Sequence, residues 1–173
     1  MQRTIWITGL SGAGKSTLGI EVVKLLRSNG EPVVYLDGDQ LREVFSAVNL
    51  TEKNHSREGR LSLAMQYSRL CDVISKQGLT VVIATISMFK EIHDWNRKNL
   101  SNYFEVFLKV PMAELQFRDP KNIYSRYNSG ELINVAGLDL NVDEPVSPDL
   151  LFDFREMNTA KQMADKIISV IQE

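Results

Sequence analysis

Nine residues near the N-terminus constrain the fold of this chain more than any other stretch: Gly9-Leu-Ser-Gly-Ala-Gly-Lys-Ser-Thr17. They fit the pattern G-x-x-x-x-G-K-[ST], which requires a preceding strand and a following helix. The sequence supplies both, because residues 3–9 are largely β-branched and aromatic and because apolar residues within 15–30 recur at helical spacing. The motif and its context therefore predict a phosphate-binding loop inside an α/β fold, rather than a chance glycine-rich turn.

The chemistry of this loop explains its spacing. Glycines let successive backbone N–H groups turn toward an anion, and the N-terminus of the following helix adds partial positive charge. Lys15 can reach the outer phosphates of ATP, and the Ser16 hydroxyl can ligate Mg²⁺. The residues predicted to bind ATP are Gly9, Leu10, Ser11, Gly12, Ala13, Gly14, Lys15, Ser16 and Thr17. The loop alone does not distinguish kinases from motors or nucleotide-dependent switches.

Strand-like and helix-like segments alternate along the rest of the chain. Strands are predicted at residues 3–9, 32–39, 79–87, 103–110 and 150–154, and helices at 15–30, 40–48, 56–78, 89–100 and 158–172. This alternation predicts a parallel sheet of about five strands, flanked by helices, in a single P-loop kinase domain that covers residues 1–173. Residues 118–148 interrupt the alternation with many Gly, Asn, Asp and Pro residues, and so long a loop is typical of a lid.

Composition narrows the range of partners. The net charge of -2 and the pI of about 5.8 argue against a nucleic-acid partner, because nucleic-acid-binding domains are usually basic. No apolar run approaches the length of about 20 residues that a membrane helix needs. The N-terminus also lacks the pattern of a signal peptide, so we expect a cytoplasmic protein with no membrane partner. The single cysteine, Cys71, lies in a helical apolar pattern and is expected to be buried.

Two carboxylates follow the second predicted strand. Asp37 and Asp39 stand at its carboxyl end, the edge that faces ligands in open α/β sheets. They can organise Mg²⁺ or accept a proton from an attacking hydroxyl, although a helix cap is the plainer alternative. Arg42 follows on nearly the same helical face. It can hold a substrate phosphate, or it can be an ordinary surface arginine.

The phosphate loop, Leu36-Asp-Gly-Asp39 and Arg42 together resemble the adenylyl-sulfate kinases. Similar segments are Ala84–Ser87 and residues 104–124, 129–139 and 144–150, so the resemblance covers nearly the whole chain. It implies a MgATP-dependent kinase that phosphorylates the 3′-hydroxyl of a small nucleotide acceptor. Because homodimers are common in this family, the resemblance also suggests a homodimer.

The resemblance implies a role for each matching residue. Lys15 and Ser16 would hold the ATP phosphates and Mg²⁺, while Asp39 would face the attacking hydroxyl and also contact the metal. Ser87 matches a serine once assigned to a phosphorylated intermediate, but we favour direct in-line transfer with Ser87 as a substrate contact. The implied substrate-side residues are Asp37, Arg42, Ile86, Ser87 and Lys121, with Arg118 on the lid near ATP.

Departures from the family pattern concentrate on the acceptor side. Val135 and the Asn49-Leu50 pair stand where the family has the two phenylalanines that sandwich adenine, and His55 stands where it has an arginine. Each lost aromatic stack removes on the order of 1–3 kcal/mol, so adenylyl sulfate should bind weakly. An offshoot of the family phosphorylates cytidine diphosphoramidate in bacterial capsule synthesis, and such an acceptor would suit this pocket. The alternatives are an authentic adenylyl-sulfate kinase and a non-catalytic nucleotide-binding switch.

The residues after position 54 leave further alternatives open. His55 either contacts a substrate phosphate or caps the helix that follows it. Arg57 and Arg60 lie one helical turn apart, so they either face an anion together or form a solvated basic face. His93 is expected on the surface of its helix, too far along the chain from His55 to indicate a metal pair.

Overall fold

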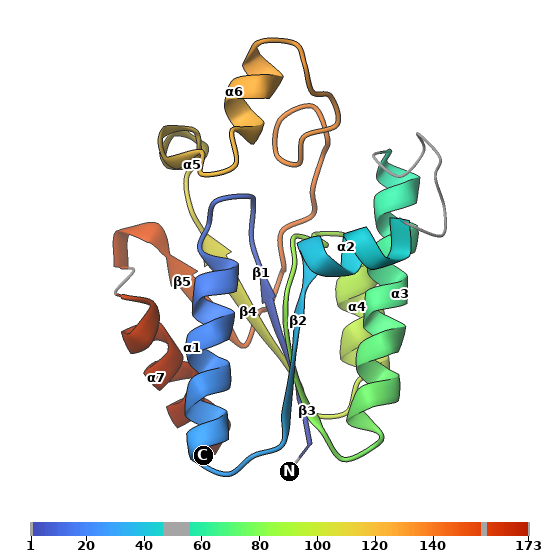
Figure 1. Cartoon of the computed structure of the whole chain (residues 1–173), viewed down its shortest axis with the longest axis vertical. Helices are drawn as coiled ribbons and strands as arrows, with labels where there is room; N and C mark the ends of the chain where they lie inside the picture. The colour runs from blue at the N-terminus through green and yellow to red at the C-terminus, as the bar shows by residue number, and fades with distance from the viewer. Residues whose placement is uncertain (1, 47–55, 157–158, 173) are drawn as a thin grey trace.

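The computed structural model describes residues 2–46, 56–156 and 159–172. Five strands form one parallel sheet: β1 (Thr4–Thr8), β2 (Val33–Asp37), β3 (Thr80–Ala84), β4 (Tyr103–Lys109) and β5 (Leu150–Asp153). Their order across the sheet is β2-β3-β1-β4-β5, which places β1 at the centre (Figure 1). The predicted parallel α/β sheet is confirmed.

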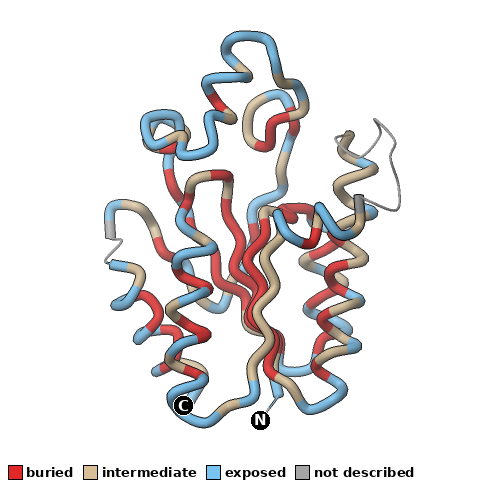
Figure 2. Tube along the Cα trace, in the orientation of Figure 1, coloured by how far each residue is buried: buried red, intermediate tan, exposed pale blue. Residues whose placement is uncertain are grey.

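The central strand β1 divides its side chains between two hydrophobic cores. Ile5 and Ile7 belong to one core and Trp6 to the other, and all three are fully buried. The neighbouring strand β3 alternates in the same way, with Val82 in the first core and Ile83 in the second. Figure 2 shows the buried residues concentrated along the central strands and the inward sides of the helices. Because both faces of the sheet are covered, these strands are continuous apolar runs.

Helices cover both faces of this sheet (Figure 1). On one face lie α1 (Lys15–Ser28) and α7 (Ala160–Gln172), and on the other lie α2 (Gly38–Ser46), α3 (Arg57–Ser75) and α4 (Lys90–Asn99). Leu18, Val22 and Leu26 of α1 point into the first core because residues four apart share one side of a helix. Cys71 of α3 is buried in the second core, as predicted.

Most element boundaries differ by a few residues from the predicted ones, and two of these differences affect the site. The strand predicted at 79–87 ends at Ala84, because the chain turns beyond it and Ser87 adopts a left-handed φ of 30° that a strand does not accommodate. The helix predicted at 40–48 begins at Gly38 instead. A Cβ atom at Gly38 would lie 2.9 Å from Thr85 Oγ1, so glycine allows the β2–α2 junction to pass close to the end of β3.

The 118–148 segment contains a helix that sequence analysis missed. Helix α5 (Met112–Arg118) leads into it, and α6 (Ile123–Asn128) lies within it above the sheet (Figure 1). Asp119 accepts hydrogen bonds from the N–H groups of Tyr124 and Ser125, at 3.1 and 2.8 Å, and so stabilises the first turn of α6. The Tyr124 hydroxyl donates to the Ser11 carbonyl at 2.9 Å. These contacts tie the segment directly to the phosphate loop.

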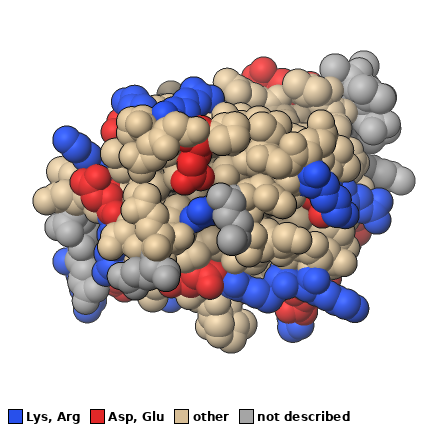
Figure 3. All heavy atoms as spheres, turned by 90° about the horizontal axis from the view of Figure 1, so that it is seen from below, with Lys and Arg blue, Asp and Glu red and all other residues tan. Residues whose placement is uncertain are grey.

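The end of the molecule that carries both termini lies opposite this segment. Figure 3 shows acidic and basic side chains interspersed on that face. Such mixing agrees with the overall charge of -2. Among the described residues, no helix is both long enough and apolar enough to cross a membrane.

Candidate active site

A cleft of about 420 Å³ opens at the carboxyl ends of the central strands. Five parts of the chain line it: the phosphate loop, the β2–α2 junction, the first turn of α3, the end of β3 and the 118–148 segment. The predicted site residues among the lining are Ser11, Gly12, Gly14, Lys15, Ser16, Thr17, Asp37, Asp39, Arg42, Arg60, Ile86 and Lys121. Folding therefore gathers into one cleft residues that are far apart in the sequence.

The phosphate loop follows β1 and passes directly into α1. Gly12 and Gly14 adopt left-handed φ values of 80° and 98°, which glycine takes without strain. Lys15 begins the helix, and its Nζ donates to the Leu10 carbonyl at 2.8 Å. Burial, followed by the nearby charge of Lys121, lowers the pKa of Lys15 to about 8. This ammonium is therefore poised to gain stabilisation from an incoming anion.

The Ser16 hydroxyl and the Asp37 carboxylate lie side by side beneath the loop. Ser16 Oγ donates to Asp37 Oδ2 at 2.7 Å, and the Tyr35 hydroxyl donates to the same oxygen at 3.2 Å. Burial alone would raise the pKa of Asp37, but hydrogen bonds from Ser16, the Asp39 backbone and Tyr35 outweigh it and lower the pKa. Two hard oxygen groups thus stand together where a divalent cation would meet ATP phosphates.

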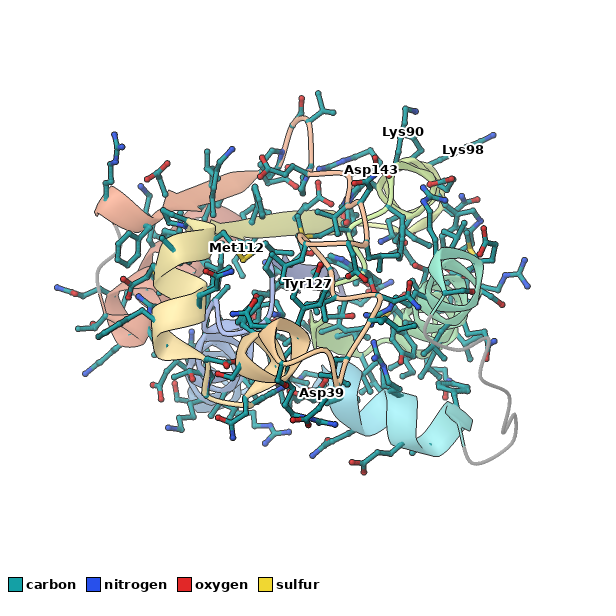
Figure 4. All side chains as sticks on the ribbon, turned by 90° about the horizontal axis from the view of Figure 1, so that it is seen from above. Asp39, Lys90, Lys98, Met112, Tyr127 and Asp143 are labelled. Atoms are coloured by element: carbon teal, nitrogen blue, oxygen red, sulfur yellow. The ribbon has the colours of Figure 1, made fainter. Side chains whose placement is uncertain are left out.

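Asp39 occupies a different part of the cleft from Asp37. Its backbone N–H donates to Asp37 Oδ1 at 2.9 Å, while its side chain is exposed and forms an ion pair with Lys121. Sequence analysis paired Ser16 with Asp39 at the metal, whereas the structure brings Ser16 to Asp37. The Asp39–Lys121 pair joins α2 to the 118–148 segment across the mouth of the cleft. Figure 4 shows Asp39 beside α2 at the edge of the opening.

Arg42 and Arg60 line the far end of the cleft and are close enough to influence each other. Burial and the charge of Arg42 lower the pKa of Arg60 to about 10. Arg60 Nη2 donates to the Asn134 carbonyl at 2.8 Å, which connects α3 to the 118–148 segment. Two neighbouring guanidinium groups at this end of the cleft favour an anionic group of the substrate.

A small side pocket of about 20 Å³ continues from the cleft beyond the two arginines. Arg42 of α2 lines it together with residues of α3, of the turn after β3 and of the 118–148 segment: Arg60, Leu63, Tyr67, Thr85, Ile86, Ser87, Met88, Phe89, Ala136, Leu140 and Val142. Ser87 Oγ is hydrogen-bonded to Thr85 Oγ1 at 2.8 Å in the pocket wall. Sequence analysis missed Tyr67, although it follows Arg60 by two helical turns and so shares its side of α3.

Several predicted site residues lie away from the cleft lining. Arg57 contacts Glu91 and Asp143 at 3.3 and 3.4 Å, so its predicted shared anion face with Arg60 is not formed in this structure. Arg118 pairs with Glu114 at 2.7 Å and lies over the Phe154 ring, 5.2 Å from its centroid. Gly9, Leu10 and Ala13 shape the loop from behind: a Cβ at Gly9 would meet the Leu108 carbonyl at 2.7 Å. The prediction for His55 lies outside the described residues.

The predicted surface position of His93 is wrong. Only 11% of its side chain is exposed, and its Nδ1 lies 2.7 Å from Oε1 of the buried Glu105. The opposite nitrogen, Nε2, lies 3.1 Å from the carbonyl oxygen of Asp143. The polar helix pattern around His93 hid this arrangement, because its partners come from β4 and from the 118–148 segment.

Comparison with known proteins places these features in one family. A sequence profile of the adenylylsulphate kinase family matches residues 1–153. The cytidine diphosphoramidate kinase of Campylobacter jejuni is 37% identical over 164 residues, which cover 95% of this chain and 93% of that protein. The probable adenylyl-sulfate kinase of Pyrococcus abyssi is 32% identical over 170 residues, which cover 98% of this chain and 95% of that protein.

Solved structures agree with the sequence relatives. The APS kinase of Mycobacterium tuberculosis, in complex with AMPPNP and APS, has a TM-score of 0.89 to this structure at 29% identity. The similarity covers 99% of this chain and 98% of that chain. These relatives are all kinases, but the acceptors in their names differ.

Proposed function

Because this chain belongs to the adenylylsulphate kinase family, we propose that it transfers the γ-phosphoryl group of MgATP to the 3′-hydroxyl of a nucleotide conjugate other than adenylyl sulfate, with cytidine diphosphoramidate as the favoured acceptor. The chain is an ATP-dependent phosphotransferase that acts on a hydroxyl group, as its relatives are. The proposal concerns the acceptor and the residues that handle it.

One observation carries the proposal: the two ends of the cleft differ in how closely they follow the family pattern. At the donor end, the complete phosphate loop, Lys15 and the Ser16–Asp37 pair lie together. At the acceptor end, Val135 and Val142 are aliphatic wall residues. An aliphatic side chain offers no flat face for a purine base to stack on. The aromatic groups near this end, Tyr67 and Phe89, instead line the side pocket.

The donor end fits MgATP. The N–H groups of the phosphate loop and Lys15 would hold the phosphates, and Ser16 and Asp37 would hold Mg²⁺, with the predicted metal contact of Asp39 as a second carboxylate nearby. The Ser16 hydroxyl oxygen and the Asp37 carboxylate oxygen lie 2.7 Å apart, and Mg²⁺ prefers oxygen ligands of this kind. When bound, Mg²⁺ neutralises charge that develops on the transferred phosphoryl group.

Asp39 is suited to receive the proton of the acceptor hydroxyl. Its carboxylate is exposed to the cleft, and the adjacent Lys121 keeps a positive charge beside it. A carboxylate that faces the nucleophilic hydroxyl acts as a general base while the oxygen attacks phosphorus in line with the leaving group. Ser87 takes no part in this transfer, because its hydroxyl is buried in the wall and hydrogen-bonded to Thr85. It serves as a wall contact for the acceptor.

Arg42, Arg60 and the side pocket would bind the rest of the acceptor. The two arginines suit its phosphate groups, and the side pocket behind them, with a volume of about 20 Å³, has room only for a small group. The 37% identity to the cytidine diphosphoramidate kinase of Campylobacter jejuni supports this acceptor and, with it, a place in capsule synthesis. An adenylyl-sulfate kinase activity is the second candidate, favoured by the Pyrococcus relative.

An acceptor screen tests the proposal. Purified protein with MgATP is mixed with cytidine diphosphoramidate, cytidine diphosphate, adenylyl sulfate or no acceptor, and ADP release is followed. We expect ADP release to depend on a cytidine conjugate, and ³¹P NMR to place the new phosphate on the 3′-oxygen. Lys15→Ala serves as the inactive control, since it removes the charge that stabilises the transition state. Rapid turnover with adenylyl sulfate alone would establish the second candidate instead.

A further inference from the structure

Asp143, which lies where the 118–148 segment returns to the sheet, contacts α3, α4 and the turn that precedes α4. Its backbone N–H donates to the Met88 carbonyl at 2.9 Å. Its Oδ2 accepts from the Lys90 backbone N–H at 3.0 Å and lies 3.4 Å from Arg57 Nη2. Its carbonyl oxygen is 3.1 Å from His93 Nε2. Figure 4 shows Asp143 beside Lys90, across the top of the molecule from Asp39.

The contacts with Met88 and Lys90 lie at or next to residues that line the side pocket. Val142 precedes Asp143 in the chain, and Met88 and Phe89 precede Lys90. The Arg57 guanidinium also lies over the Phe89 ring, 5.3 Å from its centroid. Asp143 therefore ties together the three walls of the side pocket, which come from α3, from the β3–α4 turn and from the 118–148 segment.

The N-cap residue of α4 makes no side-chain hydrogen bond to the helix within the described part of the chain. Phe89 is the N-cap residue and its side chain offers no hydrogen-bond acceptor, so the Asp143 carboxylate accepts from the first helical N–H in its place. A carboxylate in this position is also favoured by the positive end of the helix dipole. Charge and geometry both hold the 118–148 segment against α4 at this point.

His93 anchors the same junction to the buried side of β4. Its two ring nitrogens lie within hydrogen-bond distance of the Glu105 carboxylate and the Asp143 carbonyl. Glu105 is 3% exposed and also accepts from the Tyr103 hydroxyl at 2.8 Å. Because Glu105 is buried in β4, its contact with His93 anchors the junction between α4 and Asp143 to the sheet.

We infer that Asp143 is a positioning residue for the acceptor: it fixes Val142, Met88 and Phe89 so that the side pocket has its shape before the acceptor arrives. It does not touch ATP or the reacting atoms, because it lies outside the cleft lining. Loosening this junction should weaken acceptor binding while leaving the donor end unchanged. The inference rests on the proposed function only in assigning the acceptor to this end of the cleft.

The test compares Asp143→Ala and Asp143→Asn with Glu144→Ala. Glu144 is a matched control, since it is the next residue, it is 50% exposed where Asp143 is 47%, and it pairs with Lys109 away from the pocket. Steady-state kinetics use whichever of cytidine diphosphoramidate and adenylyl sulfate the wild type phosphorylates. Hydrogen exchange of residues 88–92 and 134–142 is measured in parallel, without substrate.

We expect Asp143→Ala to raise the acceptor KM about tenfold, the scale of one lost charge-assisted hydrogen bond, with the KM for ATP unchanged. Exchange in both segments should speed up. Asp143→Asn, which keeps an oxygen for the Lys90 N–H, should restore much of the loss, and Glu144→Ala should behave like wild type.

Equal rises in both KM values, unchanged exchange in Asp143→Ala, or equal effects of Asp143→Ala and Glu144→Ala would overturn the positioning role. If the wild type phosphorylates neither acceptor, the proposed function fails, and the exchange comparison still decides whether Asp143 holds the junction.

Discussion

Asp37 and Asp39 stand two residues apart but have separate partners. Asp37 is hydrogen-bonded to Ser16 and Tyr35 under the phosphate loop, whereas Asp39 reaches Lys121 at the mouth of the cleft. The turn from β2 into α2 at Gly38 sends the two side chains in different directions. We therefore propose that Asp37 mainly organises the metal and that Asp39 accepts the proton.

Substituting each carboxylate by its amide should therefore give two distinct phenotypes. Asp39→Asn keeps the shape but removes the proton acceptor, so we expect kcat to fall roughly 10²–10⁴-fold with only a small change in the Mg²⁺ requirement. Asp37→Asn should instead raise the Mg²⁺ concentration needed for half-maximal rate. Rate measurements over a Mg²⁺ series distinguish the two. If Asp37→Asn shows the larger loss at saturating Mg²⁺, the two roles are exchanged.

Lys15 gives the free enzyme a pH dependence. Because burial lowers its pKa to about 8, the ammonium is present below that pH and lost above it. We expect kcat/KM for ATP to fall about tenfold per pH unit above pH 8, since this ratio reports groups of the free enzyme. At saturating MgATP, bound phosphates favour the charged form, so kcat should hold to higher pH. A kcat/KM for ATP that stays flat to pH 10 would show that Lys15 remains charged throughout.

At the scale of the elements, the sequence patterns predicted those features that depend only on residues near one another in the chain. The phosphate loop, the apolar runs of β1 and β3 and the repeat of Leu18, Val22 and Leu26 are visible without any partner. The contacts of His93 and Asp143 were missed because their partners lie 12 and 50 or more residues away. Helix α6 was missed because Asp119, which caps it, stands among loop-forming residues. Sequence patterns thus predicted the strands and most helices, whereas the shape of the side pocket depends on contacts between elements that are far apart in the sequence.

Packing between α1 and β2 offers a test at this scale. A Cβ at Gly19 would lie 2.7 Å from Cε2 of Tyr35, the residue whose hydroxyl donates to Asp37. Alanine gains up to about 1 kcal/mol of helix propensity, but displacing a packed ring costs about 1–3 kcal/mol. Gly19→Ala should therefore lower the free energy of unfolding and raise the Mg²⁺ requirement. Urea unfolding and a Mg²⁺ series measure both, with Ile20→Ala, at an exposed site, as the control. A more stable Gly19→Ala protein with normal Mg²⁺ dependence would contradict this packing argument.

Across the whole molecule, the two ends of the cleft are built from different elements. The donor end is formed by the phosphate loop and the end of β2, and the acceptor end mainly by α3 and the 118–148 segment. The phosphate loop connects the central strand β1 to α1, and Asp37 ends the edge strand β2. Arg60, Leu140 and Val142 come from α3 and the 118–148 segment, which meet through Arg60–Asn134 and Asp143 contacts. We therefore expect substitutions in those parts to alter acceptor binding more than ATP binding. The same architecture therefore suits kinases with different acceptors.

The most direct test of this account compares kcat/KM for cytidine diphosphoramidate and adenylyl sulfate at saturating MgATP. The ratio measures the difference in transition-state binding between the two acceptors. Losing aromatic stacking on adenine costs about 3 kcal/mol, so we predict that cytidine diphosphoramidate is favoured by about a hundredfold or more. A kcat/KM for adenylyl sulfate equal to or above that for cytidine diphosphoramidate would contradict the account of the acceptor pocket.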